Sequence, residues 1–142
     1  MVKYKILVHT GDKRGAGTDA NVFVILHGEN GDSGKRKLES GGNNFERGRV
    51  DTFGMEMLDI GELKKVTIGH DGSGFGSGWF LDNVIVKDET LRNKEYKFQC
   101  GRWLDKVLLK DYQNDVSTFL LFCFCFIFTL TLSWQGKVNI FD

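Results

Sequence analysis

Apolar and polar residues alternate in short runs over most of the chain, and clusters of Gly, Asn, Asp and Ser separate these runs. A period of two is typical of a β-strand with one buried face, and no window repeats apolar residues at helical spacing for more than about a turn. The 18 glycines and the absence of proline fit frequent turns between strands. The pattern therefore predicts an antiparallel all-β domain.

The predicted strands are residues 4–10, 21–27, a short segment at Leu38, and residues 48–58, 65–70, 79–86 and 96–103. Strand 21–27 is apolar on both faces, which predicts a central position in its sheet. In strand 48–58, even-numbered residues from Val50 face one way, and Asp51, Phe53, Met55 and Met57 face the other. We expect this strand to pair with 65–70, and a single helical turn near 59–63. The aromatic residues Trp79, Phe80 and Trp103 are predicted to lie in the core.

The composition changes abruptly near the C-terminus, where residues 116–136 carry no charge. This run exceeds the roughly 18 residues needed to cross a hydrocarbon core about 30 Å thick, so it is a candidate tail anchor. Its Phe, Thr, Ile and Cys content also suits a buried or non-native extension, which we favour. We divide the chain into a domain at 3–105 and an atypical hydrophobic extension at 106–142.

Charge and cysteine content narrow the functional classes. The chain has 19 Lys and Arg and 19 Asp and Glu, so its net charge is zero and no nucleic-acid binding is expected. Cys100, Cys123 and Cys125 have no C-x-x-C spacing and are predicted to be reduced, buried thiols. The first residues lack the apolar core of a signal peptide, which favours a cytoplasmic location.

Known catalytic patterns are missing from the sequence. His9, His27 and His70 lie in different predicted strands or strand ends, without the spacing of a zinc hydrolase. The glycine-rich residues 71–78 precede no helix and match neither a dinucleotide loop, a phosphate-binding loop nor a nucleophile elbow. The sequence therefore predicts a protein that is not an enzyme.

Oxygen-bearing side chains gather in three predicted loops, at residues 12–19, 43–46 and 71–72. Calcium takes six to eight oxygen ligands from carboxylates, amides and backbone carbonyls, which such loops provide. Asp and Asn also stabilise ordinary turns. Composition alone leaves both interpretations open.

Four ordered segments, residues 10–22, 42–53, 68–82 and 100–104, resemble the signature motifs of the PLAT (LH2, lipoxygenase homology) domain family. This resemblance implies an eight-stranded sandwich of two sheets, related to C2 domains, that brings lipid enzymes to membranes or to partner proteins and has no catalysis of its own. The residues of these motifs are most similar to the PLAT repeats of a multi-PLAT protein found in hair-cell stereocilia. That likeness implies a peripheral membrane location, with stereocilia as one candidate.

In calcium-binding members of the family the ion lies between the first two signature loops. The resemblance therefore implies a calcium site formed by Gly17, Asp19, Asn43, Asn44 and Glu46, with Asp71 as a weaker candidate from the neighbouring loop. Asn44 stands where some strong calcium binders carry a carboxylate, which lowers the expected affinity. Membrane insertion in the family uses apolar loop tips, and Phe75 is the matching residue here.

The chain departs from the family pattern after Asp105, where the last strand is expected to be missing or replaced, leaving an exposed edge. The sequence thus predicts calcium-assisted membrane targeting through lipid headgroups. Two alternatives remain open. One is a calcium-independent module that links membrane and cytoskeletal proteins, and the other is an accessory domain of a lipid-modifying enzyme. Neither the lipid nor the protein partner follows from the sequence.

Overall fold

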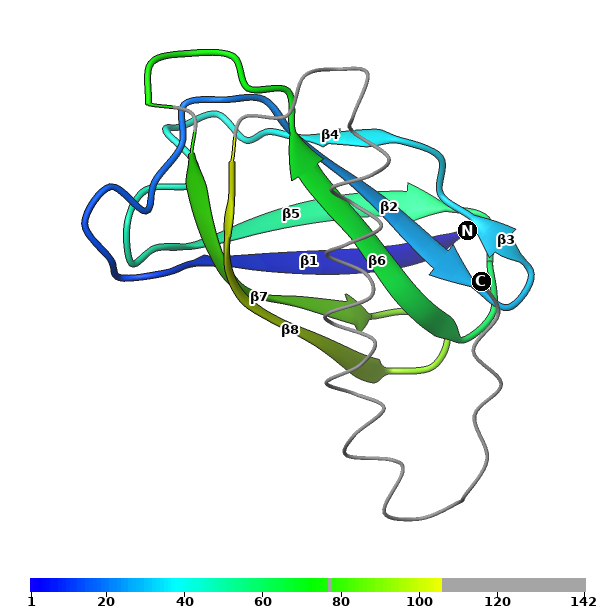
Figure 1. The fold of residues 1–142 in the computed structure, drawn as a ribbon. Helices are drawn as coiled ribbons and strands as arrows, with labels where there is room; N and C mark the ends of the chain where they lie inside the picture. The colour runs from blue at the N-terminus through cyan, green and yellow to red at the C-terminus, as the bar shows by residue number, and fades with distance from the viewer. Residues whose placement is uncertain (77, 106–142) are drawn as a thin grey trace, which may run out of the picture.

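The computed structural model describes residues 1–76 and 78–105, which form an antiparallel β-sandwich (Figure 1). The strands are β1 (Val2–Thr10), β2 (Val22–Gly28), β3 (Gly31–Asp32), β4 (Arg36–Leu38), β5 (Val50–Met57), β6 (Leu63–His70), β7 (Trp79–Asp88) and β8 (Lys94–Leu104). The described residues contain no helix. The expected all-β, two-sheet sandwich is confirmed.

One sheet has the strand order β5-β1-β7-β8. In the other sheet β2 is central, with β6 along one side and the short strands β3 and β4 sharing the opposite side. Between β3 and β4, Ser33 completes the edge: its Oγ accepts the Leu26 N–H at 2.9 Å, and its own N–H donates to the Leu26 carbonyl at 2.9 Å. The predicted central position of 21–27 is confirmed.

The core lies between the sheets and is filled by alternate residues of the long strands. Ile6, Val24, Leu26 and Val84 are fully buried. Trp79 is the largest fully buried side chain, and its indole Nε1 donates to the Thr10 hydroxyl at 3.0 Å. This hydrogen bond satisfies the polar atom of a residue that otherwise packs as a hydrophobe.

The predicted faces of β5 are confirmed, since Phe53 and Met57 are buried while Thr52 is exposed. Its predicted partner is wrong: β5 pairs with β1, and β6 pairs with β2 in the other sheet. The connection between β5 and β6 crosses from one sheet to the other, and alternation fixes a strand's faces but not its neighbours. The predicted helical turn in this connection is also wrong, because Asp59 Oδ1 accepts the Gly61 N–H at 3.0 Å and forms a local turn instead.

The aromatic prediction is correct for Trp79 but wrong for Trp103, which is 40% exposed. Phe80 is buried, at 7% exposed, but it follows Trp79 in β7 and faces the opposite side of the sheet, outside the main core cluster. There it packs edge-on against Trp103, with ring centroids 5.4 Å apart, and the Lys13 ammonium lies 4.2 Å from its centroid. The outer face of this sheet thus carries an aromatic pair.

Cys100 is buried, as predicted, and its Sγ donates to the Phe98 carbonyl at 3.5 Å. Cys123, Cys125, the extension 106–142, the replaced closing strand and the candidate anchor 116–136 lie outside the described residues. Within residues 1–76 and 78–105, no helix is long and apolar enough to cross a membrane.

Candidate functional site

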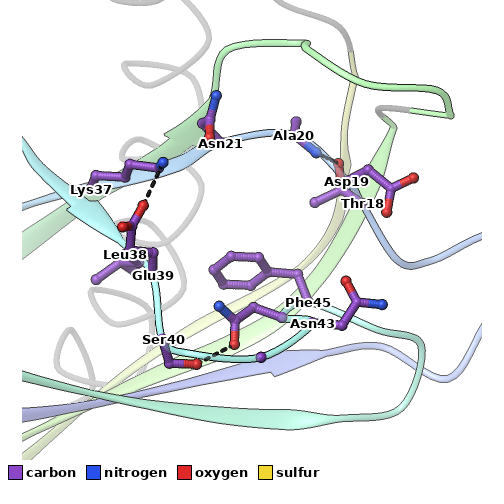
Figure 2. Close-up of a pocket in the computed structure, with 12 residues that line it drawn as sticks. Thr18, Asp19, Ala20, Asn21, Lys37, Leu38, Glu39, Ser40, Asn43 and Phe45 are labelled. Carbon is purple, nitrogen blue, oxygen red and sulfur yellow. Dashed lines mark hydrogen bonds and ion pairs between the residues drawn. The ribbon is translucent and has the colours of Figure 1, made fainter.

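Three loops meet at one end of the sandwich: residues 11–21 after β1, 39–49 after β4, and 71–76 after β6 (Figure 1). Between the first two loops lies a cavity of about 370 Å³, drawn in Figure 2. It is lined by Thr18, Asp19, Ala20, Asn21, Lys37, Leu38, Glu39, Ser40, Gly42, Asn43, Asn44 and Phe45. Asp19, Asn43 and Asn44, which the sequence singled out, therefore line the same cavity.

A close backbone approach joins the first two loops. The Thr18 N–H donates to the Phe45 carbonyl at 3.1 Å. A Cβ atom at position 17 would lie 3.0 Å from that carbonyl oxygen and 3.2 Å from the Arg47 nitrogen, which is closer than an ordinary contact. Gly17 is therefore needed for the approach, and any ligand it offers is its backbone carbonyl.

The loop that carries Asn43 and Asn44 is anchored in the core through Phe45. Phe45 has a positive φ of 61°, and its ring packs against Phe53 and Trp79 at centroid distances of 5.5 and 5.4 Å. Its N–H donates to the buried Asp51 carboxylate at 2.7 Å. Asp51 therefore holds an unfavourable backbone conformation in place.

Arg49 also joins this loop to Asp51. Its Nε lies 3.1 Å from Asp51 Oδ1, and its Nη1 donates to the Asn43 carbonyl at 2.7 Å.

The cavity offers hard oxygen donors. The Asp19 carboxylate is exposed and makes no hydrogen bond with the part of the chain that the structure describes. Asn43 Nδ2 donates to Glu46 at 2.6 Å, which leaves Asn43 Oδ1 as an acceptor. Asn44 Oδ1 accepts the Ser40 hydroxyl at 2.6 Å. Carboxylate, amide and hydroxyl oxygens suit calcium or magnesium and not the softer transition metals.

Of the predicted ligands, Gly17, Glu46 and Asp71 do not line the cavity. Glu46 reaches it only through Asn43. Asp71 accepts the Asn21 N–H at 3.1 Å and side-chain amide at 2.8 Å, and the Ser73 N–H at 3.0 Å and hydroxyl at 2.6 Å. Desolvation raises the pKa of Asp71, but these hydrogen bonds outweigh it and hold the pKa far below its ordinary value. Asp71 thus fixes the third loop to Asn21 at the end of the first loop, directly before β2.

Sequence reasoning missed Glu39 and Ser40, which line the cavity from the residues that follow β4. Glu39 forms an ion pair with Lys37, so Asp19 is the cavity's one carboxylate without a cationic partner in the described residues. Among those residues no group of three or more His, Cys, Asp or Glu side chains could hold a metal. The residues fit calcium by donor type, and their low charge implies weak binding.

Phe75 belongs to the third loop and is 97% exposed. It lies between Gly74 and Gly76, which both have positive φ, at 80° and 69°. A Cβ atom on Gly74 would lie 3.0 Å from the Cβ of Asp19, so the backbone next to Phe75 packs directly against the loop that carries the free carboxylate. The structure thus brings together the candidate ion ligand and the candidate membrane contact.

An antiparallel two-sheet sandwich with a polar cavity between the loops at one end defines a C2-like module. Within that class, the chain belongs to the PLAT/LH2 domain family, whose family model matches residues 4–116.

Among curated relatives, the chain is 53% identical over 106 residues to human lipoxygenase homology domain-containing protein 1, covering 74% of this chain and 5% of that protein. It is 34% identical over 110 residues to the allene oxide synthase-lipoxygenase protein of Plexaura homomalla, covering 75% of this chain and 10% of that protein. The chain thus spans a small part of these relatives.

Among solved structures, the coral 8R-lipoxygenase, described as activated by calcium through a C2-like domain, matches with a TM-score of 0.68 and 32% identity. That match covers 73% of this chain and 16% of the enzyme. A calcium-dependent 11R-lipoxygenase matches with a TM-score of 0.59 and 41% identity, covering 72% of this chain and 16% of that enzyme.

Proposed function

We propose that this domain is a non-catalytic binding module that targets membranes with the help of calcium. The observation that supports the proposal is the contact between the Gly74 backbone and Asp19, because it puts the 97% exposed Phe75 next to a carboxylate that has no partner in the described structure. An ion held at Asp19 would therefore lie at the same surface as an apolar side chain able to enter a bilayer.

The proposed ligands are the carbonyl of Gly17, the carboxylate of Asp19 and the amide oxygens of Asn43 and Asn44. Glu46 acts on the ion through Asn43, to which it is hydrogen-bonded. These groups leave part of a six- to eight-fold shell open, and lipid phosphate oxygens are suited to complete it. Calcium would then join the domain to an anionic headgroup and cancel the charge of Asp19.

Phe75 alone is too small an anchor. Burying one phenylalanine side chain contributes about 2 kcal/mol, or roughly a 30-fold gain in affinity, which is less than stable membrane attachment requires. The remaining free energy has to come from the ion and the headgroups. Membrane binding is therefore expected to depend on calcium and to be peripheral and reversible.

The two calcium-linked lipoxygenases support this proposal, since both are more than 30% identical to the chain over most of its described residues. A cytoplasmic, peripheral location remains a prediction, as does a place in stereocilia.

The test is co-sedimentation of the full chain with vesicles of phosphatidylcholine and phosphatidylserine, in calcium and in chelator. We expect pelleting in calcium only, a large loss for Asp19→Asn, and a loss of affinity of up to roughly 30-fold for Phe75→Ala. Equal pelleting with calcium and with chelator, or none in either, would contradict the proposal.

Matched controls come from the same fold. Asp12→Asn removes an exposed loop carboxylate that is paired with Arg47 at 2.7 Å, and Leu91→Ala removes an exposed apolar side chain from the β7–β8 connection. Neither change should alter pelleting. A loss in either control as large as that in its matched variant would show that general charge or surface hydrophobicity drives binding.

A calcium-independent protein-interaction module is the second candidate, favoured by the exposed Trp103 beside Phe80 on the outer sheet face. Aromatic residues are enriched at the centres of protein interfaces. An accessory domain of a lipid-modifying enzyme would use such a face to contact its catalytic domain. If this candidate held instead, Trp103→Ala would abolish partner binding in chelator while vesicle pelleting remained absent in wild type.

A further inference from the structure

The outer edge of β5 is a long strand edge without a partner in the described part of the chain. β5 pairs with β1 on one side only, over its whole length from Val50 to Met57. Exposed edges usually carry charged side chains, above all lysine, or inward-pointing charges, proline or a bulge that prevents pairing with another chain. β5 has no lysine, no proline and no register shift against β1, and its two charged residues, Asp51 and Glu56, are paired with Arg49 and Lys3.

Two exposed apolar side chains frame this edge. Val50, at the start of β5, is 45% exposed, and Leu58, directly after its end, is 75% exposed. At the centre, a Cβ atom on Gly54 would meet nothing within 4 Å, so the strand surface there is open. A recess of about 410 Å³ lies over the same region, and its lining includes Lys5, Thr52, Gly54, Met55 and Glu56.

We propose that this edge pairs with β5 of a second copy of the chain, antiparallel, with the two Gly54 residues facing each other on a twofold axis. The two sheets would then join into one continuous sheet. On the outer face this register sets Val50 opposite Leu58 of the second copy, and Thr52 opposite Glu56. On the core side it sets Phe53 opposite Met55.

The side chains along β5 indicate both the partner, a second copy of the chain, and the register of the pairing. Inner and outer faces must match across the pair, so the register can shift only in a way that keeps even-numbered residues opposite even-numbered ones. Moving the axis to Phe53 sets Val50 opposite Glu56, and moving it to Met55 sets Leu58 opposite Thr52. The register on Gly54 alone pairs the two exposed apolar residues with each other, twice, and sets no like charges opposite.

Charge does not oppose this pairing. Glu56 forms an ion pair with Lys3 at 3.2 Å, and Asp51 is buried against Arg49. A strand edge of this length buries less surface than a standard stable interface, so the dimer is expected to be reversible and to depend on concentration.

Cysteine cross-linking tests the register. In full-length chain with Cys123→Ser and Cys125→Ser, Val50→Cys and Leu58→Cys are made separately. Mixed under mild oxidation, the two variants should form a covalent heterodimer, because directly opposed residues bring their Cα atoms about 4.5–5.5 Å apart, within the span of a disulfide. Either variant alone should not cross-link, because position 50 lies about 26 Å from position 50 of the second copy. No cross-link in the mixture, or an equal one in a single variant, overturns the proposal.

A second pair of variants separates interface loss from misfolding. Gly54→Lys sets two ammonium groups opposite each other and should abolish the cross-link, while Gly54→Ala should keep it. In sedimentation velocity, wild type should gain mass with concentration and Gly54→Lys should not. A wild type that stays monomeric at all concentrations overturns the proposal and leaves the edge to an extended segment of a different protein.

Discussion

Asp51 holds the loop of the candidate site in place through Phe45 and Arg49, and the Asp51→Ala variant tests this role. This side chain is 4% exposed, accepts the Phe45 N–H at 2.7 Å and lies 3.1 Å from Arg49 Nε. Removing it leaves a buried N–H without a partner at a residue with φ of 61°. The loop that carries Asn43 and Asn44 should lose its anchor.

The magnitude follows from the two contacts. A hydrogen bond to a buried charged group contributes about 1.5–3 kcal/mol. The ion pair adds at most about 1 kcal/mol, because the Arg49 side chain is half exposed. We therefore expect Asp51→Ala to lower the free energy of unfolding by about 1.5–4 kcal/mol, which corresponds to a fall in Tm of about 6–16 °C.

Urea unfolding at neutral pH, followed by tryptophan fluorescence, measures this loss. Asp12→Ala is the matched control, because Asp12 also accepts an arginine Nε, at 2.7 Å, but both side chains are exposed. Its loss should stay below about 1 kcal/mol. If the two variants lost stability within about 0.5 kcal/mol of each other, the proposed role of burial at Asp51 would be wrong.

Two further predictions concern the core and acid stability. Tyr4 is buried, and its hydroxyl has no hydrogen-bond partner in the described structure, so Tyr4→Phe should leave stability unchanged or raise it by about 1 kcal/mol; a clear loss in urea unfolding would contradict this. Burial raises the pKa values of Asp71 and Asp88, but hydrogen bonds, including those from the Ser73 side chain to Asp71 and from the Leu91 N–H to Asp88, lower both values below the ordinary one. Carboxyl groups whose pKa is lowered in the folded state stabilise the protein above about pH 4, and this stabilisation is lost as the pH falls further. The free energy of unfolding should therefore decrease from about pH 4 to pH 2, and it should decrease less in Asp88→Asn. A free energy of unfolding that stays constant over that range would refute the assignment.

The sequence was sufficient for the long strands and their faces, because burial on one face produces an alternating pattern, but the two-residue strand β3 was not predicted. The exposed and buried sides of β5 are an example. It was insufficient for the partner of β5, because the chain changes sheets after Met57 and no local pattern records that crossing. The exposure of Trp103 was missed for a related reason: an aromatic residue in a strand can face outward when a second ring, here Phe80, covers part of it.

The loops of the candidate site were recognisable in the sequence from their oxygen-bearing residues. The sequence did not show which of these side chains lie close together. Asp19, Asn43 and Asn44 line one cavity, whereas Asp71 is engaged in holding its own loop. Glu39 lines the cavity although it carries no motif, because the short strand β4 delivers it there. Contacts between loops depend on the packing of the sheets, which local sequence does not specify.

Isothermal titration of the full chain with calcium in the absence of lipid tests most directly whether the cavity lined by Asp19, Asn43 and Asn44 binds calcium. We predict one site with a dissociation constant on the order of 0.1 mM, since a single unpaired carboxylate should place it at the weak end of protein sites. Asp19→Asn should abolish the binding, and Asp12→Asn should leave it unchanged. No heat of binding up to about ten times that concentration, or binding that survives Asp19→Asn, would contradict the claim.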